Sequence, residues 1–131
     1  MNIEWLPVVG YESLYLVSND GQVMSLPRLQ YQPIGGVRQI GGKVLKSPSN
    51  NIGYSQVTLC GPYDRKNVKV HRLVAVAFIP NPLNLPEVNH KDLNKANNSV
   101  NNLEWVTSKQ NKKHATDNGV VFGNFAAGKR S

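Results

Sequence analysis

The chain has 131 residues and one cysteine, and its 15 lysines and arginines against eight acids give a formal charge of +7. This length suits one domain, or one small domain with a smaller module packed on it, and excludes a second independent core. The single cysteine, Cys60, excludes an internal disulfide and a zinc site built from paired cysteines. No apolar run approaches the roughly 20 residues that span a bilayer, and the N-terminus does not resemble a signal peptide, so we expect a soluble cytoplasmic protein with no membrane partner.

The charge is distributed unevenly along the chain. Residues 1–27 contain three acids and no lysine or arginine, whereas the rest of the chain contains all 15 basic residues and five acids. A basic segment of this kind favours a polyanion such as nucleic acid, because contacts to phosphates release counterions. The alternative is that the charge only keeps the protein soluble.

Alternating or continuous apolar runs, separated by turn sequences, characterise the first half of the chain. Asn19, Asp20 and Gly21 are a hairpin signal, because these residues adopt positive φ at low cost. Residues 27–42 are rich in Gly, Gln and Pro, and predict a flexible, exposed basic loop. The expected strands are residues 14–18, 22–26, 43–45, 54–59 and 68–70. They predict a small, mostly antiparallel sheet.

The periodicity changes at His71. From there the apolar residues recur at helical spacing, and Pro80 prevents a helix from continuing. β-branched residues in this segment leave a strand as the alternative. Residues 87–90 and 103–106 then predict two short strands around a polar, asparagine-rich loop.

A helix start follows the second of these strands. Thr107 and Gln110 form a capping box, which predicts a helix from residue 108 to Gly119. Residues 120–131 contain two glycines and have no clear partner face, so we expect a flexible tail.

One histidine and two asparagines suit the hydrolysis of a phosphodiester. That reaction needs a base for water and a hard cation for the charge on the transition state and the leaving oxygen. His90 ends the first of the two short strands, and Asn111 follows it by 21 residues, in the first turn of the expected helix. A strand, a loop, a strand and one helical turn use about that length, so Asn111 can return beside Asn89 and His90.

Three blocks of the sequence resemble a known nuclease family. The first is Glu-Trp-Leu, Gly-Tyr-Glu and Tyr-x-Val-Ser-Asn-x-Gly within residues 4–27. The second is Val-His-Arg-Leu-Val-Ala followed by Phe-Ile-Pro-Asn-Pro, and the third runs from Val-Asn-His-Lys-Asp to Asn-Leu-Glu-Trp-Val-Thr. Residues 71–111 resemble the HNH nuclease domain of intron-encoded homing endonucleases and related phage nucleases. Residues 4–27 resemble the small module that often precedes it.

The resemblance implies a role for each matching residue. His90 matches the general base, and Asn111 matches a metal ligand. Asn102 matches the middle asparagine, which ties the loop so that His90 keeps its orientation. Asn89 occupies a metal-binding position where better-known members have an aspartate, and this departure implies weak affinity for Mg²⁺ or Mn²⁺. Taken without the resemblance, these asparagines are equally suited to turns and caps.

The implied substrate is double-stranded DNA, cut by a monomer that acts in the cytoplasm, and in that of the host cell if a phage encodes it. Basic residues of the segment 28–46, the first helix, the loop after His90 and the last helix are the candidate DNA contacts. They are Arg28, Arg38, Lys43, His71, Arg72, Lys91, Lys109, Lys112 and Lys113.

The sequence thus predicts an α+β protein, with an N-terminal β-rich module followed by a ββα-metal HNH nuclease domain. The expected parts are residues 1–46 for the module and its basic loop, 47–119 for further strands and the nuclease domain, and 120–131 for the tail. The predicted function is a metal-dependent DNA endonuclease that nicks one strand. One alternative is a DNA-binding protein whose nuclease site has decayed at Asn89. An RNA-binding protein is a weaker alternative, because no aromatic pair has the spacing of an RNA-stacking motif.

Overall fold

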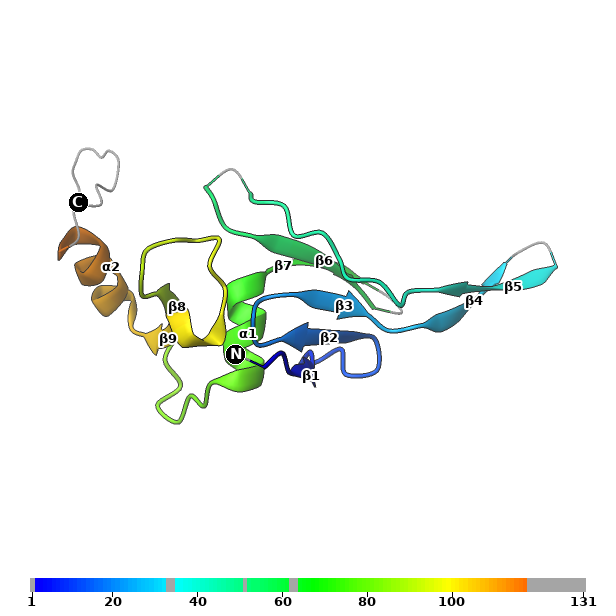
Figure 1. Cartoon of the computed structure of the whole chain (residues 1–131), viewed down its shortest axis with the longest axis horizontal. Helices are drawn as coiled ribbons and strands as arrows, with labels where there is room; N and C mark the ends of the chain where they lie inside the picture. The colour runs from blue at the N-terminus through cyan, green and yellow to red at the C-terminus, as the bar shows by residue number, and fades with distance from the viewer. Residues whose placement is uncertain (1, 33–34, 51, 62–63, 118–131) are drawn as a thin grey trace.

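The computed structural model describes residues 2–32, 35–50, 52–61 and 64–117 (Figure 1). Most strands precede residue 70, and helices and strands mix after it, so the predicted α+β class is confirmed. The predicted tail, residues 120–131, and the predicted helix end at Gly119 lie outside the described residues. Within the described part of the chain, no helix is long and apolar enough to cross a membrane.

A three-stranded antiparallel sheet opens the fold. It contains β1 (Trp5–Pro7), β2 (Tyr15–Ser18) and β3 (Val23–Ser25) in that spatial order, and it includes the predicted hairpin. Gly21, in the turn between β2 and β3, has a φ of +91°. A Cβ at this position would lie 2.9 Å from Cβ of Asn98, so both the backbone conformation and the space require glycine.

The prediction of a flexible loop at residues 27–42 is wrong. The structure has a hairpin there, in which β4 (Arg28–Gln32) pairs antiparallel with β5 (Gly36–Ile40). The hairpin extends away from the rest of the molecule (Figure 1). Leu29 and Val37, which lie on the same face of the hairpin, are more than half exposed. Residues 28–32, Arg-Leu-Gln-Tyr-Gln, alternate polar and apolar as a strand does, but the glycines and prolines around them are typical of a loop and led to the wrong prediction.

A second hairpin leads directly into the first helix. The antiparallel strands β6 (Gln56–Cys60) and β7 (Arg65–Lys69) precede α1 (Val70–Phe78), which confirms the predicted helix over the strand alternative. The strand expected at 43–45 is reduced to one isolated bridge at Val44.

The last three elements form the predicted ββα unit. β8 (Glu87–His90) pairs antiparallel with β9 (Leu103–Val106), and both strands have the bounds that the sequence predicts. The helix α2 (Ser108–Asp117) follows. The capping box that begins it is present, since Thr107 Oγ1 accepts from the Gln110 backbone N–H at 3.0 Å, and Gln110 Oε1 accepts from that of Thr107 at 2.9 Å.

One hydrophobic cluster joins the N-terminal sheet, β6, α1 and the ββα unit. Its fully buried members come from both sides of residue 46, so the predicted module and the downstream segment share a core, and the predicted boundary itself stays a prediction. These members, each 0% exposed, are Val17, Val23, Leu59, Val70, Val74 and Ala75.

Candidate active site

His90, the last residue of β8, is 5% exposed. Its Nε2 lies 2.8 Å from Oδ1 of Asn98. An amide oxygen can only accept, so Nε2 carries the ring proton and Nδ1 keeps the lone pair that a base requires. Burial lowers the pKa of His90, and the hydrogen bond to Asn98 opposes that shift only in part. The imidazole is therefore neutral near pH 7.

The loop that carries Asn98 is fixed by Asn102. Asn102 Nδ2 donates to Oδ1 of Asp92 and to the carbonyl of Asn97, both at 2.9 Å. Its Oδ1 accepts from the Asp92 backbone N–H at 3.1 Å. These bonds close the loop between β8 and β9, and support the orienting role implied for Asn102, which stays a prediction.

Two glutamates orient the amides of the predicted metal ligands. Asn89 Nδ2 donates to Glu104 Oε2 at 2.7 Å, and Asn111 Nδ2 donates to Glu87 Oε1 at 2.8 Å. Only the NH₂ group of an amide can donate to a carboxylate, so these partners settle which way each amide points. Hydrogen bonds from Ser108 and Asn111 lower the pKa of Glu87, which keeps it ionised.

His90 and both candidate ligands line one cavity of about 150 Å³. The structure therefore brings the three residues together as the spacing predicts. Lys112, a predicted DNA contact, also lines it, together with Tyr54 and Lys95, which the sequence did not single out. A cavity that combines a neutral imidazole, two amides and two lysines suits an anionic substrate.

The donor set fits a hard cation that is held weakly. No three His, Cys, Asp or Glu side chains among the described residues gather as a metal site. Asn89 and Asn111 instead offer neutral oxygens, with their NH₂ groups held on carboxylates. Mg²⁺ binds through few protein ligands and keeps waters or phosphate oxygens for the rest of its shell, so two such oxygens are compatible with it.

A cluster of three aromatic rings, those of Tyr54, His71 and His90, lies beside the cavity. The ring centroids of His71 and His90 are 4.7 Å apart, and those of Tyr54 and His71 are 5.2 Å apart with nearly parallel planes. Burial, followed by the charge of His90, lowers the pKa of His71 to about 3. The predicted DNA contact of His71 stays a prediction, and the structure places this ring 8% exposed and neutral.

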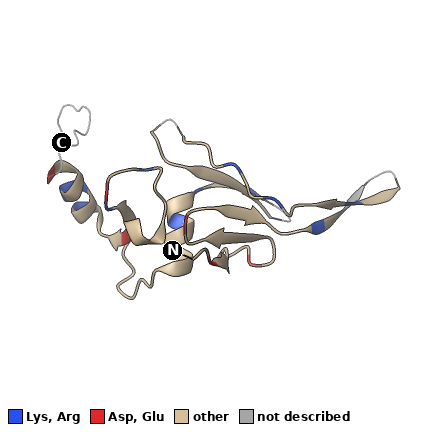
Figure 2. Cartoon of the chain, in the orientation of Figure 1, with Lys and Arg blue, Asp and Glu red and all other residues tan. Residues whose placement is uncertain are grey.

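The remaining predicted DNA contacts fall into two groups along the fold, one towards α2 and one towards the β4–β5 hairpin (Figure 2). Near the ββα unit lie Arg72, Lys91, Lys109, Lys112 and Lys113, all exposed. On or beside the β4–β5 hairpin lie Arg28, Arg38 and Lys43, which do not line the cavity. Arg72 also donates to the carbonyl of Pro86 at 2.9 Å, and Lys113 forms an exposed ion pair with Asp117 at 3.4 Å.

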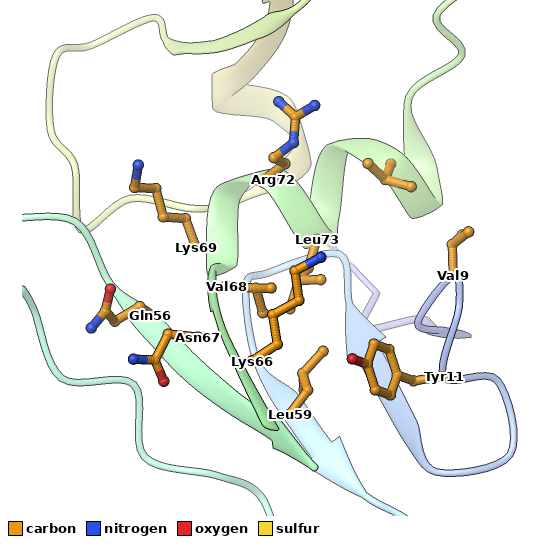
Figure 3. Close-up of a pocket in the computed structure, with 11 residues that line it drawn as sticks. Val9, Tyr11, Gln56, Leu59, Lys66, Asn67, Val68, Lys69, Arg72 and Leu73 are labelled. Carbon is orange, nitrogen blue, oxygen red and sulfur yellow. The ribbon is translucent and has the colours of Figure 1, made fainter. Parts of the chain in front are cut away.

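A larger cavity of about 460 Å³ lies between α1, β6, β7 and the segment near Tyr11 (Figure 3). Its floor includes Leu59, Val68 and Leu73, and the exposed Lys66 lies at its side. No histidine and none of the predicted catalytic or metal-binding residues line it. We therefore place the candidate active site in the smaller cavity.

Sequence reasoning missed Asn98, Tyr54 and the two glutamates. One signal could have revealed Glu104, because antiparallel pairing of the two predicted strands with His90 opposite Leu103 puts Asn89 opposite Glu104. Asn98 and Tyr54 carry no such signal, since their roles depend on contacts made across loops.

Comparison with known proteins gives two family matches. The NUMOD4 motif matches residues 4–60, and the HNH endonuclease model matches residues 68–113. The DNA endonuclease I-HmuI of Bacillus phage SP01 is 36% identical over 119 residues, which are 91% of this chain and 61% of that protein. An uncharacterized HNH endonuclease, L245 of Acanthamoeba polyphaga mimivirus, is 40% identical over 76% of this chain and 26% of its own length.

A solved structure also matches. It is described as DNA binding and cleavage by the HNH homing endonuclease I-HmuI, and it superposes with a TM-score of 0.73 at 36% identity. The match covers 95% of this chain and 64% of that one. This chain thus spans less than two thirds of the length of both relatives and of the chain in the solved structure.

Proposed function

Because this chain belongs to the HNH homing-endonuclease family, we propose that it is a DNA endonuclease whose active site is the cavity around His90. The observation that carries the proposal is the convergence of His90, Asn89 and Asn111 on that one cavity. The hydrogen bond from Nε2 of His90 to Asn98 adds a base with a free lone pair on Nδ1.

In the proposed reaction, Nδ1 of His90 takes a proton from a water molecule. The oxygen of that water forms a bond to the phosphorus, and the bond from phosphorus to the 3′-oxygen breaks. The products are a 5′-phosphate and a 3′-hydroxyl, the latter after the leaving oxygen takes a proton from solvent. Asn98 holds the imidazole so that the lone pair faces the cavity, and Asn102 holds the loop that carries Asn98.

HNH nucleases generally use a divalent metal ion. We propose that Asn89 and Asn111 hold Mg²⁺ or Mn²⁺ through their amide oxygens, with Glu104 and Glu87 orienting the amides. The ion supplies positive charge for the transition state and for the leaving oxygen. Because both ligands are neutral, the affinity for free metal is low, and the substrate phosphate completes the site.

The proposed substrate is double-stranded DNA, bound by a monomer that cuts one strand. A single active site acts on one phosphodiester at a time, which supports nicking. The basic surface near α2 lies beside the cavity and supplies phosphate contacts. Lys112 belongs both to this surface and to the lining of the cavity. The β4–β5 hairpin offers Arg28 and Arg38 to a more distant part of the duplex.

One observation favours a second candidate, a DNA-binding protein without nuclease activity. Asn89 provides no negative charge to the cation, unlike the aspartate that the family resemblance leads us to expect. Glu104 lies against Asn89 but is engaged by its NH₂ group. The second candidate therefore has normal DNA affinity and no cleavage.

Nicking of a supercoiled plasmid separates the two candidates. We expect open-circular product with Mg²⁺ or Mn²⁺, none with EDTA, and none from His90→Ala, while all three conditions retain DNA binding in a gel-shift assay. If the unmodified chain binds DNA but does not nick it at any metal concentration, the result supports the second candidate, a DNA-binding protein without nuclease activity. Linear product formed without an open-circular intermediate contradicts nicking.

A further inference from the structure

The aromatic cluster of Tyr54, His71 and His90 joins the two segments that the family models match. Tyr54 lies in the segment matched by the NUMOD4 motif, whereas His71 and His90 lie in the segment matched by the HNH model. The His90 ring also lies 6.0 Å from the Tyr54 ring, with the planes tilted by 34°. A residue of the N-terminal segment therefore reaches the proposed base.

A single hydrogen bond cannot fix the His90 ring by itself. The bond from Nε2 to Asn98 holds one ring atom at 2.8 Å, but leaves the plane of the ring free to rotate about that contact. The ring of His71, a residue that is 8% exposed, lies 4.7 Å from the His90 ring with the planes tilted by 36°, and this contact restricts that freedom. Tyr54 in turn stacks on His71, with an angle of 16° between the planes.

Tyr54 is itself held in place from several sides. Oδ1 of Asn50 accepts from the backbone N–H groups of Ile52 and Tyr54, both at 3.0 Å, which shapes the turn before the tyrosine. Lys95 Nζ donates to the carbonyl of Ile52 at 2.8 Å and lies 4.7 Å from the centre of the Tyr54 ring. Lys69 Nζ lies 5.3 Å from the same centre. The loop around Tyr54 is thus anchored on the loop that follows His90.

We propose that Tyr54 and His71 are positioning residues for the nuclease, and that their stacked rings fix the plane of His90 so that Nδ1 faces the reacting water. This inference rests on the proposed function, and it adds that the N-terminal segment supplies part of the active site in addition to any DNA contact. The ring faces do this work, so an apolar ring of similar size can replace either residue. The bulk of His71 matters, and its nitrogens do not.

The first test is single-turnover cleavage at saturating enzyme, with DNA affinity measured in parallel. Tyr54→Ala and His71→Ala should lower the cleavage rate on the order of tenfold to a hundredfold, as expected for a misplaced reacting group, and leave the Kd for DNA unchanged. Tyr54→Phe and His71→Phe should recover most of the lost rate. Tyr11→Ala is the matched control, because it removes another half-buried tyrosine ring that lies outside the aromatic cluster. This control should lower the Tm without lowering the rate.

Three results overturn the inference. A weaker Kd with an unchanged rate at saturation shows that Tyr54 contacts DNA. A His71→Phe variant as slow as His71→Ala shows that a ring nitrogen is required. A rate loss in Tyr11→Ala equal to that in Tyr54→Ala shows that both tyrosines act only through stability.

A second measurement tests the contacts of the aromatic cluster without an assay of DNA cleavage. The chain contains three histidines, so their ring C–H signals can be assigned by NMR with one variant for each. Tyr54→Ala and His71→Phe should shift the His90 signals through the changed ring current, while Tyr11→Ala should not. If the unmodified chain does not cut DNA but these shifts occur, the proposed function is wrong and the contact of the two rings with His90 is confirmed. If the chain cuts DNA and the His90 signals do not move, the proposed function is supported and the positioning role of the two rings is wrong.

Discussion

Nε2 of His90 donates to Oδ1 of Asn98 at 2.8 Å, and both side chains are 5% exposed. This bond determines which ring nitrogen carries the proton, and so which nitrogen can act on water. The partner comes from the asparagine-rich loop, eight residues after the histidine.

Replacement of Asn98 tests this relationship. Asn98→Ala should lower the cleavage rate on the order of tenfold to a hundredfold, because the ring loses its orientation, and leave DNA affinity unchanged. It should also cost about 1–3 kcal/mol in the free energy of unfolding, since a buried N–H loses its acceptor. Asn101→Ala, at an exposed position of the same loop, is the control. Equal rates for the two variants in single-turnover assays would refute the role of Asn98.

Removal of the imidazole tests the base itself. His90→Ala should lower the cleavage rate about 10²–10⁴-fold, because the water then loses its proton acceptor. Circular dichroism and a gel-shift assay should show that the fold and the DNA affinity persist. Normal nicking by the purified variant would exclude His90 as the base.

Asn89 and Glu104 together test the metal site. Asn89→Asp should lower the Mg²⁺ concentration that gives half-maximal nicking, because an anionic oxygen binds a hard cation more strongly than an amide oxygen. Without metal, the new carboxylate would face Glu104 across the strands, so the Tm should fall and should recover on addition of Mg²⁺. The double variant Asn89→Asp with Glu104→Gln should restore the metal-free Tm.

Asn111→Ala should raise the required Mg²⁺ concentration or abolish turnover. Titrations of nicking rate and of Tm against Mg²⁺ give both readouts. A metal dependence that none of these variants changes would place the ion elsewhere.

The basic surface near α2 predicts a salt-dependent affinity for DNA. Lys112→Glu should weaken binding to all sequences alike and reduce the slope of log Kd against log salt by about one, as expected for one phosphate contact. Lys113→Glu should have a smaller effect, because Lys113 is paired with Asp117 and does not line the cavity. Fluorescence anisotropy at several salt concentrations measures both slopes. Salt-independent binding would remove the case for nucleic acid.

Arg28 and Arg38 lie on the hairpin, and their replacement should change sequence preference if the hairpin enters a groove.

Burial of His71 predicts a loss of stability in acid. Its folded pKa, about 3, lies below the ordinary value of 6.5, so the unfolded chain takes up this proton first as the pH falls. The stability that the neutral ring contributes is complete above pH 6.5 and is lost progressively towards pH 3, by at most about 1.4 kcal/mol per pH unit. His71→Phe should flatten this part of the profile. Urea unfolding at pH 7, 5 and 4 measures the difference, and parallel profiles for the two proteins would contradict it.

The ββα unit could be predicted from the sequence because its signals are local. The strand bounds at 87–90 and 103–106 follow from short apolar runs beside turn residues, and the start of α2 follows from the Thr107 capping box. The β4–β5 hairpin was not predicted although residues 28–32, Arg-Leu-Gln-Tyr-Gln, alternate polar and apolar, because the glycines and prolines around them are typical of a loop.

The residues of the candidate site also comprise some that the sequence predicts and some that it does not. His90, Asn89 and Asn111 were identified through their spacing and the family resemblance, and the structure brings them to one cavity. Asn98 was hidden among many asparagines of equal chemical character, and the choice between them depends on loop geometry. Tyr54 lies 36 residues before His90, and no periodicity links two residues that meet only through tertiary packing.

The turn at Gly21 has a consequence for recombination between genes. A side chain at this position would push against Asn98, and therefore against the amide that holds the base. A chimera that joins this HNH segment to the N-terminal segment of another protein must keep glycine at that turn. Any side chain there would displace Asn98 and, with it, His90. The two segments are thus a matched pair, and an exchange near residue 60 can succeed only with partners whose β2–β3 turn is built on glycine.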